Sequence, residues 1–143
     1  MADKYDRLKL DNQLCFPLYA CSKEVVRRYK PYLDKIGLTY TQYITMMVLW
    51  EKGEIGVKAL GECLFLDSGT LSPLLKTLEK KGLLERKRDE EDERNLRVHI
   101  TEKGTALRDD AVDIPLKMGA CLNIDAEEAQ TLYRILHKLM SDF

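Results

Sequence analysis

Apolar side chains recur with the period of a helix along most of the chain. Residues 11–35 carry them at spacings of four, three and four, and Pro31 and Gly37 are expected to end this first helix. Shorter helices are predicted at 40–53, 57–64 and 68–81, and two more follow Thr101 and Asp125. The last helix carries one apolar stripe, made of Ala129, Leu132, Tyr133, Leu136, Leu139 and Met140.

The predicted helix ends have side chains suited to capping. Thr39 and Gln42 match a capping box, in which each side chain accepts a hydrogen bond from the other residue's backbone N–H. Asp67 precedes the helix at 68–81 as its N-cap, and Gly82 follows that helix at the position where glycine is favoured. These residues fix where the predicted helices begin and end.

The period changes to two between Leu83 and Thr101. Residues 83–88 and 95–101 have strand character, and a largely acidic segment at 89–94 separates them, so they should form a hairpin with a solvated tip. Helix, short helix, helix and hairpin is the order of a winged helix-turn-helix, which is expected at about 39–101.

The predicted fold class is mainly α with a small β hairpin, in a single domain over 1–143. The flanking helices, about 11–35 and 102–143, bury their apolar stripes poorly alone. We therefore expect them to form a dimerisation layer in a symmetric homodimer.

The composition excludes several classes of protein. An apolar content of 45% in 143 residues is that of a globular chain, and a net charge of −1 argues against indiscriminate polyanion binding. No signal peptide is visible and no apolar run nears the roughly 18 residues that span a bilayer, so a cytoplasmic protein with no membrane partner and reduced cysteines is expected. The cysteines form no CxxC pair and neither histidine has a cysteine close by, so no metal and no cofactor are expected.

The helix at 68–81 has the two faces of a DNA-reading element. Its apolar face holds leucines, while its opposite face holds small, hydroxyl and basic side chains: Gly69, Ser72, Pro73, Lys76 and Lys80, flanked by Thr70 and Thr77. Such side chains suit the major groove, although an ordinary solvated helix face would look the same. The basic run Arg86, Lys87 and Arg88, with Arg94 after it, favours the DNA interpretation because a wing needs cations there. Asp92 is expected to hold Arg94 in position.

Cys15 is the candidate for thiol chemistry. We expect it about one turn inside the first helix, behind Asp11 or Asn12 as a cap, where backbone N–H groups and the helix dipole favour a thiolate. Tyr19 lies four residues further on the same face. Tyr29 would lie about 21 Å along a straight helix, so it could reach only the Cys15 of an antiparallel partner. Cys21 and Cys63 are interpreted as small core residues.

The chain resembles the MarR-family regulators, and closely their organic hydroperoxide resistance regulator branch. The resemblance covers nearly the whole chain and is carried by Leu14-Cys15-Phe16, Tyr19, Leu66–Leu71, Pro73–Lys76, Arg86–Arg88, Glu90–Arg94, Thr101-Glu102 and Ala111–Pro115. It implies a winged-helix dimer that represses a peroxidase gene and leaves an inverted-repeat operator when organic peroxide oxidises its cysteine. It also implies roles for individual residues: Cys15 as the sensor with Tyr19, Tyr29 and Tyr40 around it, Ser68, Thr70, Ser72, Pro73 and Lys76 in the major groove, and Asp92 with Arg94 at the wing tip.

Cys121 resembles the second, C-terminal cysteine of one branch of that family. Oxidised Cys15 would then condense either with Cys121 of the partner subunit or with a small thiol. Two other functions stay open on the sequence: a MarR-type repressor relieved by a small aromatic ligand, and a thiol peroxidase. No arginine lies near Cys15 in sequence to polarise a peroxide, so a regulator that is not an enzyme is the preferred hypothesis.

Overall fold

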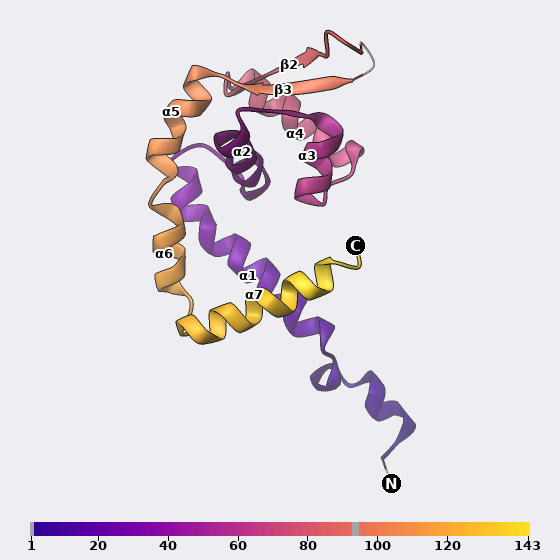
Figure 1. The fold of residues 1–143 in the computed structure, drawn as a ribbon. Helices are drawn as coiled ribbons and strands as arrows, with labels where there is room; N and C mark the ends of the chain where they lie inside the picture. Colours follow the sequence, from indigo (N-terminus) through magenta and orange to yellow (C-terminus); the bar gives the residue numbers. More distant parts are fainter. Residues whose placement is uncertain (1, 93–94) are drawn as a thin grey trace. The chain divides into compact units, whose positions relative to one another are not determined.

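The computed structural model describes residues 2–92 and 95–143 as two compact units, one ending at Val112 and one beginning at Asp113. Figure 1 shows the chain in sequence colours. The first unit contains, in chain order, the 3₁₀ turns η1 (Lys4–Leu8) and η2 (Leu10–Asn12), α1 (Cys15–Asp34), α2 (Tyr40–Lys52), β1 (Glu54–Gly56), α3 (Val57–Leu64), α4 (Ser68–Lys80), β2 (Leu84–Arg88), β3 (Leu96–Ile100) and α5 (Glu102–Ala111). The second unit contains α6 (Ile114–Cys121) and α7 (Ala126–Met140).

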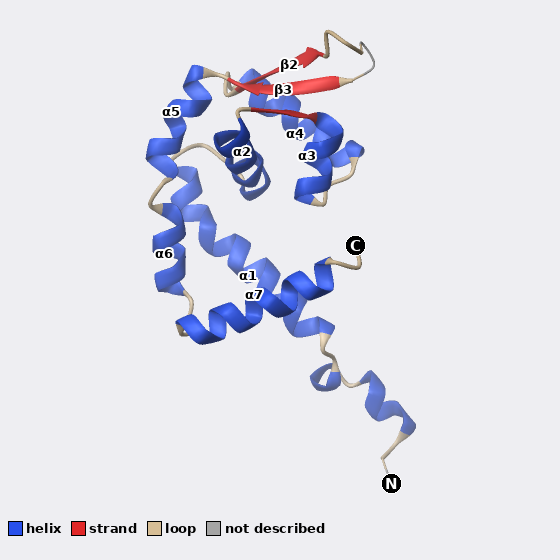
Figure 2. Ribbon diagram, in the orientation of Figure 1, coloured by secondary structure: helices blue, strands red, loops and turns tan. Residues whose placement is uncertain are grey.

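The strands form one antiparallel sheet in the order β1-β3-β2 (Figure 2). β2 and β3 are the predicted hairpin, in which Arg86 lies opposite Val98. β1 was not predicted, because three residues are too short to show a period; it places Ile55 opposite Val98 on the other edge of β3. The predicted fold class, mainly α with a winged helix-turn-helix, is confirmed, with a sheet one strand wider than the hairpin.

The core of the first unit lies between α2, α3, α4 and the inner face of the sheet. Its side chains are almost fully buried leucines with one valine and one methionine: Met46, Leu49, Leu60, Leu71, Leu75, Leu78, Leu84 and Val98. Burial of each such side chain stabilises the fold by about 1.5–3 kcal/mol. The indole N–H of Trp50 on α2 donates to the carbonyl of Gly104 at 2.8 Å, which holds α5 against this core.

The predicted caps of α2, α4, α5 and α7 are confirmed. Thr39 and Gln42 form the capping box of α2, and the Asp67 side chain accepts from the Thr70 N–H at 2.7 Å at the start of α4. Thr101 caps α5, and Asp125 caps α7. Gly82 follows α4 with φ +78°, a left-handed conformation that glycine adopts without strain. The chain therefore turns from α4 straight into the sheet.

The expected start, cap and end of α1 were wrong. Cys15 is the first residue of α1, and Leu14 precedes it without a side-chain cap, because Asp11 and Asn12 belong to the separate turn η2. Pro31 lies inside α1, which continues to Asp34.

Cys21 and Cys63 are exposed rather than buried. The only buried residue of α1 is Leu33, near its end, so the half of the helix that carries Cys21 adds little to the core of its own unit. On α3 the buried positions are Leu60 and Gly61, and Cys63 lies outside the core.

Within the described residues, no helix has both the length and the apolar character needed to cross a membrane.

Candidate functional site

The exposed face of α4 carries all five side chains predicted to read the major groove. Ser68, Thr70, Ser72, Pro73 and Lys76 are exposed, whereas Leu71, Leu75 and Leu78 on the other side of the helix are at most 1% exposed. Hydrogen bonding from Thr70 also lowers the pKa of Asp67, so this cap stays ionised at neutral pH. The Asp67 cap thus fixes the start of α4. The polar face of α4 is exposed along its length, so it is accessible to a partner as large as DNA.

The cations of the wing differ from one another in the structure. Arg86 lies on the inner face of β2, where its guanidinium contacts Glu79 of α4 and its side chain is 24% exposed. Lys87 lies on the outer face, is 62% exposed and pairs with Glu85 at 3.3 Å. Arg88, the last residue of β2, is exposed. The structure therefore leaves Lys87 and Arg88 at the surface and draws Arg86 inward.

The predicted wing tip is described only in part. The Asp92 carbonyl accepts the Asn95 N–H at 2.9 Å, and its carboxylate lies 3.5 Å from the Asn95 amide. These contacts close the loop between β2 and β3. Arg94 lies outside the described residues.

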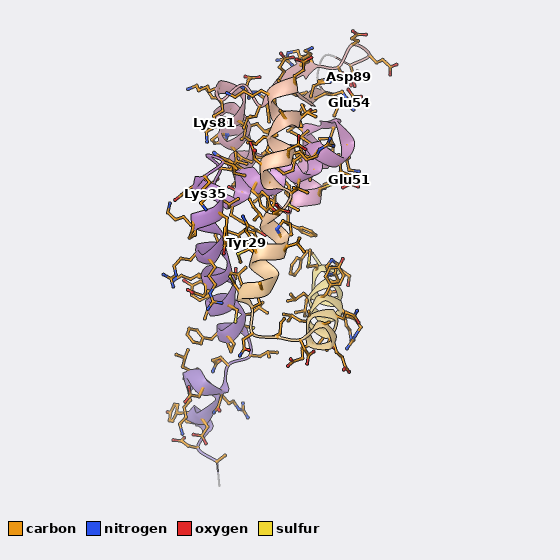
Figure 3. The ribbon with its side chains drawn as sticks, turned by 90° about the vertical axis from the view of Figure 1, so that its left-hand side faces the viewer. Tyr29, Lys35, Glu51, Glu54, Lys81 and Asp89 are labelled. Atoms are coloured by element: carbon orange, nitrogen blue, oxygen red, sulfur yellow. The ribbon has the colours of Figure 1, made fainter. Side chains whose placement is uncertain are left out.

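The outer face of the sheet adds charged residues that sequence analysis did not select. Arg97 on β3 lies opposite Lys87 and forms an ion pair with Glu54 on β1 at 3.5 Å. His99 lies 2.9 Å from the same carboxylate. Glu54 and Asp89 lie near each other at this end of the unit (Figure 3). The inward alternation of Leu96, Val98 and Ile100 was the signal that Arg97 points outward, next to Lys87.

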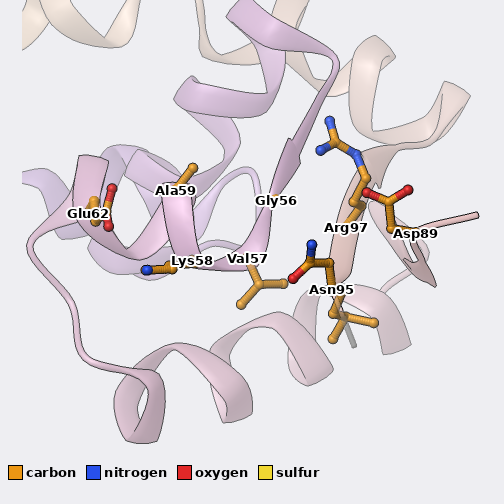
Figure 4. A pocket seen from close by; sticks show the side chains of 9 residues that line it. Gly56, Val57, Lys58, Ala59, Glu62, Asp89, Asn95 and Arg97 are labelled. Carbon is orange, nitrogen blue, oxygen red and sulfur yellow. The ribbon is translucent and has the colours of Figure 1, made fainter. Parts of the chain in front are cut away.

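An open cleft of about 560 Å³ lies between the start of α3 and the wing (Figure 4). Lys58 and Glu62 border it from α3, and Asn95 and Arg97 border it from the wing. Both signs of charge line it. The cleft therefore belongs to the polar surface between α3 and the wing and lacks the character of a separate anion site. Among the described residues, no three His, Cys, Asp or Glu side chains gather as metal ligands.

Cys15 and Tyr19 share the exposed first turns of α1. Cys15 is exposed, and Tyr19 is 60% exposed with the Lys23 ammonium 5.1 Å from its ring centroid. Cys15 is the first residue of α1, and the first turn of a helix has backbone N–H groups without intrahelical partners. The site is open to a small oxidant.

Tyr29 and Tyr40 lie together at the other end of α1, with ring centroids 5.0 Å apart. Tyr43, which sequence analysis missed, completes the cluster at 5.7 Å from Tyr29; its position three residues after Tyr40 on α2 was the available signal. Burial raises the pKa of all three phenols, so they stay protonated at neutral pH. Since α1 is one continuous helix, this cluster lies about 21 Å along the axis from the Cys15 of the same chain.

A smaller, mostly apolar pocket of about 280 Å³ borders Tyr40. Its other lining residues come from the second half of α1 and the turn after it: Val26, Arg27, Lys30, Leu33, Asp34, Leu38 and Thr39.

Cys121 lies in the other unit, as the exposed last residue of α6. The structure therefore groups the candidate residues into an exposed polar surface on α4 and the wing, an exposed thiol and a tyrosine cluster.

Three comparisons place these features among known proteins. The family model of transcriptional regulator SarA/Rot matches residues 27–111. The organic hydroperoxide resistance transcriptional regulator of Bacillus subtilis is 48% identical over 135 residues, which cover 94% of this chain and 90% of the relative. The HTH-type transcriptional regulator SarZ of Staphylococcus epidermidis is 45% identical over 132 residues, covering 92% and 89%.

Solved structures of AbfR, a protein of Staphylococcus epidermidis, show the same fold. Reduced AbfR bound to DNA is 31% identical with a TM-score of 0.80, and covers 97% of this chain and 96% of AbfR. Overoxidised AbfR bound to DNA is 30% identical, also at a TM-score of 0.80, with 98% of each chain covered. The disulfide-formed AbfR matches with a TM-score of 0.63 at 31% identity, over 97% and 92% of the two chains.

Proposed function

The chain belongs to the MarR family of transcriptional regulators, in the branch of the organic hydroperoxide resistance regulators, and on this premise we propose that it is a DNA-binding repressor that senses organic peroxide through Cys15. One observation carries the proposal. An exposed cysteine begins α1 in a chain that is 48% identical to an organic hydroperoxide resistance regulator over 94% of its length.

DNA binding uses α4 and the wing. The exposed hydroxyl, proline and lysine side chains of α4 enter the major groove, and Lys87, Arg88 and Arg94 of the wing contact the backbone and the minor groove. Asp92 closes the wing loop through its contacts with Asn95. The relative AbfR, solved on DNA in its reduced form, has the same fold.

A homodimer covers the apolar side chains that each unit leaves exposed. In the second unit these include Leu116, Leu132, Tyr133 and Leu139, and in the first they include Leu8, Leu14 and Leu18. Exposed apolar side chains in such numbers are typical of an interface between copies. Two-fold symmetry then requires an inverted-repeat operator whose half-sites lie about one turn of DNA apart. A repressor acts beside the chromosome, so we place the protein in the cytoplasm.

The chemistry at Cys15 is a displacement on the peroxide. The thiolate attacks one oxygen of an organic hydroperoxide, an S–O bond forms, the O–O bond breaks, and the alkoxide leaves and takes up a proton. Sulfur is thereby oxidised to a sulfenic acid and the peroxide is reduced to an alcohol. A second thiol, either Cys121 of the partner subunit or a small thiol, attacks this sulfur; an S–S bond forms and water leaves. Tyr19 of the same helix, with Tyr29 and Tyr40 of the partner subunit, lines the reacting thiol.

The disulfide is the state that leaves DNA. AbfR has been solved both in a disulfide-formed state and, overoxidised, on DNA. We therefore expect stoichiometric peroxide to release this protein, and a large excess, which drives Cys15 past the sulfenic acid, to release it less.

A second candidate function rests on the pocket of about 280 Å³ beside Tyr40. Its mostly apolar walls fit a small aromatic ligand, which would relieve repression without oxidation. Stoichiometric consumption of peroxide, rather than repeated turnover with a thiol reductant, distinguishes the peroxide-sensing regulator from a thiol peroxidase.

DNA binding before and after peroxide tests the proposal. The reduced protein first selects its operator from a library of random duplexes, and fluorescence anisotropy then follows release by stoichiometric cumene hydroperoxide and recovery on adding dithiothreitol. Cys15→Ser should bind like the parent and ignore the peroxide. Cys63→Ser, which removes another exposed thiol, is the matched control and should respond like the parent. Release of Cys15→Ser at the parental peroxide concentration would place the sensor elsewhere.

A further inference from the structure

Glu79 joins the last turn of α4 to the middle of β2. One carboxylate oxygen accepts the backbone N–H of Arg86 at 2.9 Å, and the other lies 3.1 Å from Nη2 of the same residue. Both oxygens of one carboxylate therefore bind one wing residue, through its main chain and its side chain.

The position of β2 explains why this acceptor matters. β2 is an edge strand, paired only with β3, so part of its backbone N–H groups point away from the ladder. The N–H of Arg86 finds its acceptor on α4 instead of in the sheet. α4, the helix predicted to read the major groove and here called the recognition helix, thus supplies the acceptor for a backbone N–H on the open edge of the wing.

Burial also restricts the Arg86 side chain to this position. Its Nε is buried and has no hydrogen-bond partner among the described residues, so Glu79 is the acidic group that compensates the guanidinium charge there. A guanidinium on Glu79 also lowers the pKa of that carboxyl, which keeps it ionised at neutral pH. Removing Glu79 would leave a partly buried cation and an open backbone donor, both of which are costly.

Lys87 shows the opposite arrangement one residue further along. It points to the outer face of the sheet, and its partner Glu85 lies on the same strand, so this pair does not join the wing to another element. Neighbouring cations in one basic run are therefore placed for different tasks.

Resting on the DNA-binding function proposed above, we propose that Glu79 and Arg86 are positioning residues. They hold the wing at a set position on the recognition helix, so that α4 and the wing meet DNA as one rigid surface, and Arg86 itself makes no phosphate contact. Without the pair, DNA must order the wing at the moment of binding, which weakens affinity without changing the number of phosphates neutralised.

The salt dependence of DNA binding separates positioning from phosphate contact. Glu79→Ala should weaken binding of the reduced protein to its selected duplex on the order of tenfold, the size of one charge-assisted hydrogen bond, with an unchanged slope against salt. Glu79→Gln should recover part of the loss, because its amide oxygen still accepts the Arg86 N–H. Lys87→Ala should make the slope shallower by about one unit for each lysine lost. Glu85→Gln, which removes a carboxylate on the other face of β2, is the matched control and should leave Arg86 in place.

Hydrogen exchange tests the contact between Glu79 and Arg86 without DNA. The Arg86 amide should lose protection in Glu79→Ala, and keep most of it in Glu79→Gln and Glu85→Gln. If the parent binds no duplex at all, the proposed function fails. Hydrogen exchange would then still show whether Glu79 holds the Arg86 amide. Arg86→Ala should weaken binding without changing the salt slope. Parental affinity in Glu79→Ala, an Arg86 amide equally protected in all variants, or a salt slope in Arg86→Ala that falls like that of Lys87→Ala would overturn the proposal.

Discussion

Gly104 is the position where a single methyl group should damage the winged helix most directly. It is the third residue of α5, its N–H donates to the Thr101 hydroxyl at 3.0 Å, and its carbonyl accepts the Trp50 indole. A Cβ at this position would lie 2.2 Å from the carbonyl oxygen of Leu83 and 2.9 Å from Cγ1 of Ile100. The first of these neighbours is backbone, so no side-chain rotation relieves the clash.

The cost of Gly104→Ala follows from that geometry. A normal contact requires α5 and the turn at Leu83 to separate by roughly 1 Å, which over-packs the site at about 1–3 kcal/mol. The separation also strains the Thr101 N–H to Leu83 carbonyl bond and the Trp50 bond, each worth about 1 kcal/mol. Alanine returns about 1 kcal/mol of helix propensity. The net loss is about 2–4 kcal/mol, or a fall in Tm of about 4–16 °C for a chain of this length.

Calorimetry on the reduced protein, at one fixed protein concentration, measures this fall. Gly119→Ala is the matched control, since Gly119 is also helical and a Cβ there meets nothing within 4 Å. The control should gain up to about 1 kcal/mol, because only the propensity term acts. If Gly104→Ala melts at or above the parental temperature, α5 does not pack on the Leu83 turn as described.

Three further predictions concern the thiols, the wing and the tyrosines. After stoichiometric organic peroxide, non-reducing electrophoresis should show a covalent dimer that Cys121→Ser cannot form; a dimer that persists in the variant would exclude Cys121 as the resolving thiol. Arg94→Ala should weaken operator binding by about 1–3 kcal/mol and make the salt slope shallower, without changing peroxide reactivity at Cys15; parental affinity and slope would mean that the wing does not touch DNA. Burial raises the pKa of Tyr29 and Tyr40 above the ordinary 10.0, so their contribution to stability is present below that pH and is lost as pH rises through the higher, folded-state values. Tyr29→Phe should therefore lose less of its Tm above that pH than the parent loses, and equal losses in thermal melts would refute this.

The short-range features of the fold could be predicted from the sequence, because their causes lie within a few residues. Thr39 with Gln42, Asp67 with Thr70 and Asp125 with Glu128 are three positions apart, so each cap depends on local backbone geometry alone. The alternation in β3 and the leucine face of α4 likewise record which side meets the core. These patterns also sufficed to place the exposed polar face of α4.

The tertiary structure decided what depends on neighbours far away in sequence. β1 exists because Ile55 meets Val98, and the contact of Tyr29 with Tyr40 needs the turn between α1 and α2. The start of α1 was mispredicted because Asp11 and Asn12 fold into the separate turn η2, in which the Asn12 amide donates to the Asp6 carbonyl. Arg86 and Lys87 are the sharpest case: adjacent cations are equivalent in a sequence pattern, but strand alternation sends them to opposite faces and only one of those faces has Glu79. A charge run predicts a basic surface, whereas burial and partners decide which of its cations remain available to DNA.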